Sequence, residues 1–233
     1  MKIDFTPYFE KYKTIVTQAD ELFARVQKDH QECVTCKIKC ADCCHALFDL
    51  TLIEAIYINH QFNKTIKGKG KIRLIDRANR ADRKTHMVKK QAYKNKKAGK
   101  NETEILMDIA AERVRCPLLN DNDMCDLYEY RPITCRLYGI PTSIGGRSHT
   151  CGKSGFIEGK QYPAVNLDAI QKKLYDISSE FVREIKTKYL KMADMLVPLS
   201  MAILTDFDEE YLGIAISKKA KEERGRENEQ NLT

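Results

Sequence analysis

The sequence predicts a mainly α-helical fold, and three observations support this prediction. Apolar residues recur at helical spacing in several segments, and helix-capping residues precede those segments. The cysteines fall into two stretches in which apolar residues do not recur at helical spacing. A chain of 233 residues buries roughly 70–75% of the surface it exposes when unfolded, so its core needs no cross-links. We expect one domain over residues 1–233, with residues 64–100 as a basic excursion within it.

Helices are expected first in the amino-terminal half. Apolar side chains recur every three or four positions over residues 8–29, which predicts an amphipathic helix. Thr51 and Glu54 have capping-box spacing before an apolar stretch and predict a helix over residues 52–63. Gly68 and Gly70 are expected to interrupt the basic segment that begins after this helix.

A second set of elements is expected in the carboxy-terminal half. Asn101 and Glu104 offer another capping pair, which predicts a helix over residues 103–113. Loops and short turns are expected over 116–159, which is rich in Pro, Gly, Asn and Asp. Helical periodicity returns over 166–190, and a further helix is expected after Asp206.

Two features bear on the compartment. The amino terminus carries charges where a secretory signal needs an apolar run, so a cytoplasmic location is expected. The apolar stretch from Met195 to Thr205 has eleven residues, too few to cross a bilayer, so no membrane span is expected. The polar residues 222–233 are expected to form a disordered tail.

The chain contains nine cysteines, an odd number, in a compartment where thiols stay reduced. Crowded thiols are easily oxidised, and metal ligation is the commonest use that turns crowding into an advantage. Five cysteines fall within twelve residues, at positions 33, 36, 40, 43 and 44. Four more are widely spaced, at positions 116, 125, 135 and 151, so the fold must bring them together. The prediction is therefore a single helical domain with two cysteine-bearing metal-binding loops.

The spacing leaves several arrangements open. Cys43 and Cys44 are adjacent, and neighbouring side chains usually diverge, so one of them is expected to face a second site or other partners. Eight cysteines can supply two four-thiolate sites, or one cluster with further structural thiols. A thiol-redox role through Cys33 and Cys36, or Cys40 and Cys43, is the non-metal alternative, and it requires a low-pKa thiolate.

Two blocks of the sequence resemble the YkgJ-type cysteine-cluster family, whose members are zinc- or iron-chelating. The first is CKIKCADCCHALFDLTLIEA, residues 36–55, and the second is CPLLNDNDMCDLYEYRPITCRLYGIP, residues 116–141, followed by Cys151. The first block departs from the family's spacing, with x3 between Cys36 and Cys40 and an additional Cys33. The resemblance favours Cys36 over Cys33, and the expected ligands are Cys36, Cys40, Cys43, Cys44, Cys116, Cys125, Cys135 and Cys151.

An iron-sulfur cluster of the 4Fe-4S type is the expected cofactor, with zinc as the alternative. Zinc modules usually show two clean cysteine pairs, whereas here one group has pairs and the other has single cysteines. Arg131 and Arg136 lie inside the second block and are expected to offset the negative charge of the thiolates. His45 and His149 lie beside cysteines and are weighed as substitute ligands.

The expected function is that of a carrier, electron-transfer or maturation factor with an unknown protein partner. The alternative is a metal-dependent protein-modifying enzyme related to flagellin lysine N-methylase, which has a similar cysteine cluster. No Gly-rich loop for a nucleotide-like methyl donor is visible, so the methylase activity is not carried over. No catalytic residues can be assigned.

The basic excursion is the remaining feature of the sequence. Residues 61–100 contain fifteen Lys or Arg and two acids, a net charge of +13, while the whole chain carries +7. Such a segment predicts contact with a polyanion, either nucleic acid, anionic lipid or an acidic protein. The simpler interpretation is a solvated, partly helical insertion, because a run of charged residues alone is a weak indicator of binding to a partner.

Overall fold

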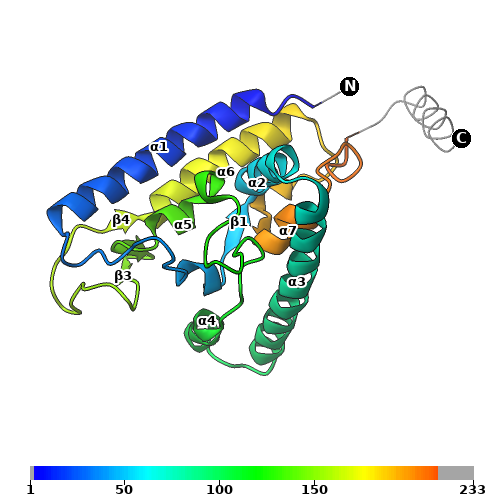
Figure 1. Ribbon diagram of the computed structural model, residues 1–233. Helices are drawn as coiled ribbons and strands as arrows, with labels where there is room; N and C mark the ends of the chain where they lie inside the picture. The colour runs from blue at the N-terminus through cyan, green and yellow to red at the C-terminus, as the bar shows by residue number, and fades with distance from the viewer. Residues whose placement is uncertain (1–2, 215–233) are drawn as a thin grey trace, which may run out of the picture.

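The computed structural model describes residues 3–214, and the prediction of a mainly α-helical chain is confirmed. Within these residues there are seven α-helices, arranged as Figure 1 shows. They are α1 (Thr6–Asp29), α2 (Leu52–Thr65), α3 (Gly68–Lys97), α4 (Glu102–Ala111), α5 (Ile133–Leu137), α6 (Leu167–Glu184) and α7 (Leu199–Leu204). No helix among the described residues has both the length and the apolar character needed to span a membrane.

The centre of the fold is the packing of α1, α2 and α6 on one another. The apolar face predicted for the first helix is confirmed, since Phe9 and Tyr12 of α1 are buried. Both rings meet Tyr57 of α2, with ring centroids 5.2 and 4.8 Å apart respectively. Phe181 of α6 is fully buried in the same core. The helix α2 is apolar on most sides because it lies between the others.

Two small sheets complete the core and the loops. The strands β1 (Asp49–Thr51) and β5 (Leu196–Pro198) pair antiparallel, with Leu50 opposite Val197. The second sheet has the order β3-β2-β4, in which β2 (Thr142–Ile144) pairs antiparallel with β3 (Arg147–His149) and parallel with β4 (Val165–Asn166). The apolar stretch predicted to be core thus forms β5 and α7.

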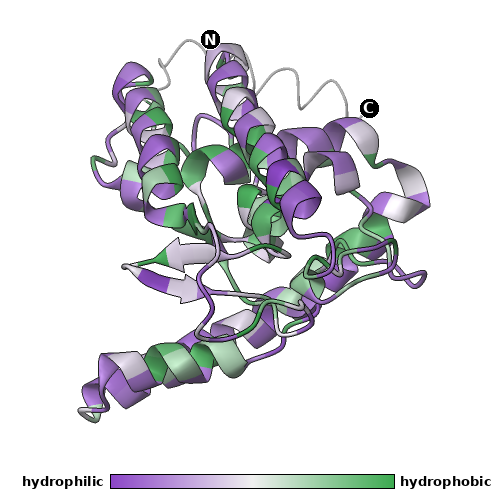
Figure 2. Ribbon diagram, turned by 90° about the vertical axis from the view of Figure 1, so that its left-hand side faces the viewer, coloured by the Kyte–Doolittle hydropathy of each residue, from purple (hydrophilic) through white to green (hydrophobic). Residues whose placement is uncertain are grey.

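The helix α3 corrects the sequence prediction for the basic segment. Gly68 and Gly70 do not interrupt it, and one helix of 30 residues begins at Gly68. Gly68 has a φ of +54°, which glycine adopts at little steric cost, and so permits the sharp turn from α2 into α3. The end of α3 and the adjacent α4 extend away from the other helices in both views (Figures 1 and 2).

Two further boundaries differ from the prediction. The helix α6 ends at Glu184, not near residue 190, because Lys186 adopts the left-handed conformation with a φ of 50°. The helix expected after Asp206 is absent from residues 206–214, which form turns. The predicted tail at 222–233 lies outside the described residues.

Glu54 connects the two sequence blocks inside the core. The predicted capping box is confirmed, since its Oε2 accepts hydrogen bonds from Thr51 N at 3.3 Å and Thr51 Oγ1 at 3.1 Å. Its Oε1 accepts from Ile133 N, at the start of α5, at 3.2 Å. Burial raises the pKa of Glu54, while these hydrogen bonds act in the opposite direction. One buried carboxyl group therefore caps α2 and fixes the beginning of α5.

Replacement of Glu54 by alanine should lower the free energy of unfolding by about 2–4 kcal/mol. The variant loses a helix cap and leaves the Ile133 N–H buried without its acceptor. Urea denaturation of the wild type and Glu54→Ala measures the difference. Glu21→Ala, on the exposed face of α1, is the control and should change stability by no more than about 0.5 kcal/mol. Equal stability of the two variants would contradict the role given to Glu54.

Candidate metal centre

The first cysteine stretch is hydrogen-bonded to both ends of the second. At the end of the first stretch, Cys116 N donates to Cys44 O at 2.7 Å and Val114 N donates to His45 O at 3.1 Å. At its beginning, Gly155 N donates to Cys33 O at 2.8 Å, and Thr35 Oγ1 donates to the Lys153 carbonyl at 2.8 Å. Backbone contacts of this kind hold the two loops together independently of any cysteine side chain.

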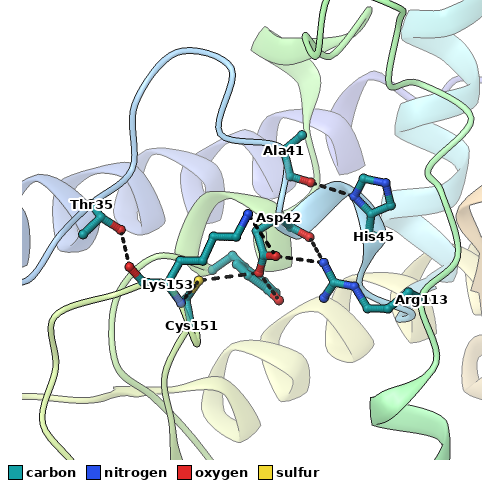
Figure 3. Close-up of polar contacts among 8 residues, drawn as sticks. Thr35, Ala41, Asp42, His45, Arg113, Cys151 and Lys153 are labelled. Carbon is teal, nitrogen blue, oxygen red and sulfur yellow. Dashed lines mark hydrogen bonds and ion pairs between the residues drawn. The ribbon is translucent and has the colours of Figure 1, made fainter.

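Asp42 joins the same segments through its side chain (Figure 3). Its Oδ1 pairs with Arg113 Nη2 at 2.8 Å and with Lys153 Nζ at 3.6 Å. Its Oδ2 accepts from Tyr138 Oη at 3.2 Å and lies 3.6 Å from Cys151 Sγ. Burial opposes the charge on Asp42, but the Arg113 guanidinium holds the pKa of the carboxyl below its ordinary value. A charged carboxylate thus connects four parts of the loop region.

Cysteines from both stretches line one cavity of about 330 Å³. Its other walls come from α3 and from the start of α7, so the cavity lies between the loops and the helical body. Cys43 and Cys44 reach it from a short 3-10 helix and Cys135 from α5. The cysteines that line it are Cys40, Cys43, Cys44, Cys116, Cys125 and Cys135.

The remaining cysteines, Cys33, Cys36 and Cys151, do not line this cavity. Cys36 is exposed, and its sulfur packs against Gly139, where an added Cβ would lie 2.1 Å from Sγ. Cys151 is buried beside Asp42. Cys33 is also buried, with its sulfur 3.5 Å from Glu32 Oε1. All nine cysteines are free thiols.

The thiols form two sets, and within each set the charge of one thiol affects the pKa of another. In the first set every pair interacts in this way, and its members are Cys43, Cys116, Cys125 and Cys135. In the second set, Cys36, Cys40 and Cys151, every pair interacts as well. Cys36 also interacts with Cys43, and Cys43 hydrogen-bonds with the Cys44 thiol, so the two sets adjoin. Cys33 belongs to neither set.

The protonation of these thiols depends on their surroundings. Although Cys36 is exposed as a residue, partial burial of its sulfur raises its pKa to about 11, and burial raises the pKa of Cys116 to about 12. Burial also raises the pKa of Cys125 and, further, that of Cys135. The pKa of Cys43 is raised first by its hydrogen bond with Cys44 and then by burial. The low-pKa thiolate that a thiol-redox site needs is not found at these positions.

The two arginines predicted beside the site are placed differently. Arg131 lines the cavity, with its guanidinium 4.0 Å from the Tyr128 ring centroid. Its positive charge lowers the pKa of four thiols, although burial raises their pKa by more. These thiols belong to Cys36, Cys43, Cys125 and Cys135.

Arg136 is buried in a different set of contacts. Its guanidinium pairs with Asp20 of α1 at 2.6 Å and donates to the carbonyls of Arg131 and Glu129. It does not line the cavity, and it braces the loop that carries Arg131 against α1.

The histidines stand outside the cavity lining. His45 Nδ1 lies 3.0 Å from the carbonyl of Ala41 (Figure 3), and His149 is exposed on β3. Within residues 3–214, no three Cys, His, Asp or Glu side chains are arranged closely enough to hold a metal ion. The cysteines that line the cavity are therefore not arranged as a coordination site in this structure.

A comparison with protein families shows which family the chain belongs to. The model of the CxxCxxCC family, described as a "putative zinc- or iron-chelating domain", matches residues 32–152, just over half of the chain. The chain belongs to the CxxCxxCC family. The matched residues contain all nine cysteines, and the family description supports a metal-binding role for them. Searches of curated proteins and of solved structures found no match.

The donor set of this CxxCxxCC domain fits zinc or iron. Thiolate sulfur is the ligand that both zinc and iron-sulfur clusters accept, and six thiols share the cavity with one carboxylate, that of Asp123. Sequence reasoning missed Asp42 and Arg113, which join the loops. The position of Asp42 between Cys40 and Cys43 was a visible signal, whereas nothing in the sequence singled out Arg113.

Metal binding to the reduced, metal-free protein should release protons. Thiols whose pKa is raised to about 11 or 12 are protonated at pH 7, and a ligand thiol must lose its proton to bind zinc. A four-thiolate zinc site should therefore release about four protons per ion, and affinity should rise with pH. Titration with zinc in weak buffer containing a pH indicator measures the number. Release of fewer than two protons would show that thiols are not the main ligands.

Proposed function

We propose that the chain holds an iron-sulfur cluster of the 4Fe-4S type, with zinc as the alternative metal. In this proposal it acts in the cytoplasm as a carrier, electron-transfer or maturation factor for a protein partner. The observation that supports it most directly is the shared cavity, which six cysteines from both stretches line. Cys43, Cys116, Cys125 and Cys135 are the ligands we favour, because every pair of them is close enough to interact electrostatically and all four line the cavity.

The size and charge of the cavity favour a cluster over a single ion. A zinc ion lies about 2.3 Å from each of four sulfurs, so a structural zinc site is compact. A cavity of about 330 Å³ has room for several iron and sulfide atoms. Four thiolates around such a cluster leave excess negative charge, which the guanidinium of Arg131 is placed to offset.

The surroundings of the cavity support a carrier function. Ile38, Met124 and Tyr128 line it and are 79, 46 and 56% exposed. Lys37 and Lys39 flank Ile38 and also line the cavity. Exposed apolar side chains with a charged rim are typical of a surface on which another protein docks. A partner docked there would come close to the cluster that the cavity holds.

A metal-dependent protein-modifying enzyme is the second candidate. The cavity supports this candidate, because the apolar residues Phe48, Ala81 and Leu199 also line it. An apolar group of a substrate could bind against them beside the cysteines. An open coordination position would be required. If the protein is an enzyme, a bound substrate should change the absorption spectrum of the metal centre, whereas a carrier should respond only to its partner protein.

Purification without oxygen should yield about four iron and four sulfide per chain, with broad absorption near 400 nm. Iron, zinc and acid-labile sulfide are quantified on the same sample. One zinc per chain without sulfide would establish the alternative metal. Protein that contains neither iron nor zinc in stoichiometric amount would refute both versions of the proposal.

Serine replacements should distinguish the proposed ligands from Cys33. We expect Cys135→Ser and Cys116→Ser to lose at least half of the bound metal, because each removes a thiolate of the proposed ligand set. Cys33→Ser is the control, since Cys33 stands apart from the other thiols, and it should keep the wild-type amount. Circular dichroism confirms that each variant is folded. Retention of metal in both ligand variants, or its loss in Cys33→Ser, would contradict the assignment.

A further inference from the structure

The helix α3 concentrates the basic charge of the chain on its solvent face. Five of its cations are exposed and have neither an ion pair nor a side-chain hydrogen bond among residues 3–214: Lys69, Arg73, Arg83, Lys90 and Lys94. Lys97 is also exposed, and its Nζ lies 4.8 Å from the Tyr93 ring centroid. At about 100° per residue, all six fall on one side of the helix. These six cations form a stripe, and we call it the basic stripe.

The opposite face of α3 is fixed in the fold. Leu74, Ala78, Ala81 and Thr85 are buried, and the helix packs against α7 and α4 on that side. Some other basic residues of α3 are used internally, such as Arg77, which pairs with Asp126 at 2.6 Å. The basic stripe is therefore held in one orientation and faces solvent.

Acidic residues do not balance this stripe. Asp82 is turned towards the body, where its Oδ1 accepts from Ser200 Oγ at 3.1 Å. Asp76 forms an ion pair with Arg80 of the same helix. The stripe therefore keeps a net positive charge, and a polyanion bound to it would release counterions.

The shape of the stripe selects among polyanions. A helix of 30 residues is about 45 Å long, which exceeds one turn of B-form DNA at about 34 Å. The exposed apolar residues Ile72, Met87 and Tyr93 are scattered among the cations. A membrane-surface helix needs a continuous apolar face, so this pattern disfavours a lipid surface. It also lacks the row of aromatic residues on which single-stranded bases stack.

We propose that the basic stripe binds the phosphate backbone of duplex DNA, with the solvent face of α3 along the major groove. That groove is about 12 Å wide and admits an α-helix, whereas the major groove of duplex RNA is deep and narrow. Arg73 and Lys97 lie at the two margins of the stripe, about 120° apart around the helix, so these margins face phosphates of the two strands. Binding is through the backbone and independent of base sequence.

The test uses the full chain with its metal bound and a fluorescent DNA duplex of mixed sequence with 20 base pairs. Anisotropy gives the affinity between 50 and 200 mM NaCl. The triple variant Arg83→Gln, Lys90→Gln, Lys94→Gln should bind on the order of 100-fold more weakly at 0.1 M salt. Its slope of log affinity against log salt should be smaller by about 2–3, because three phosphate contacts are lost.

A matched control carries the same change in net charge on other elements. Arg25→Gln, Lys28→Gln, Lys191→Gln removes three exposed cations that lie outside α3, and its affinity should stay within about twofold of the wild type. Equal weakening of both triple variants would overturn the proposal, as would no binding by the wild type at 50 mM NaCl. Tighter binding to an RNA duplex or to phosphatidylserine vesicles would also overturn it.

Discussion

The backbone pairing between residues 44–46 and 113–116 is the constraint on which the candidate metal centre depends. Ala46 and Arg113 form an isolated bridge, and the two hydrogen bonds beside it place Cys44 against Cys116. Loops rich in turns have no ladder to hold them, so these few bonds and the Asp42 ion pairs set their relative position. These contacts fix the backbone of the two cysteine stretches independently of the cysteine side chains.

A second constraint ties this loop region to the helical core. Glu54 caps α2, whose amino terminus comes after the first cysteine stretch, and accepts a hydrogen bond from the start of α5, which carries Cys135. Arg136, the next residue of α5, is fixed to Asp20 of α1. The loop region around Cys135 is therefore anchored to α1 and α2. This explains how segments with little regular secondary structure can hold their cysteines in fixed positions.

The sequence predicted the helices better than the site because local signals determine helices. The Thr51–Glu54 spacing marked the start of α2, and the apolar spacing of α1 identified the face on which Phe9 is buried. The two glycines at the start of α3 were misinterpreted, because a glycine with positive φ begins this helix and does not break it. The hydrogen bond from Ile133 N to Glu54 joins residues 79 positions apart, and no local sequence pattern indicates it.

The prediction for the site was limited in the same way. That cysteines of both stretches would meet could be inferred from their number, but the division into sets depends on the direction of each side chain. Cys36 resembles its neighbours in sequence, yet its sulfur lies against Gly139, outside the cavity that Cys43 lines. Arg131 and Arg136 are five residues apart, and one faces the thiols while the other faces α1. Such differences arise from tertiary packing, which spacing alone does not encode.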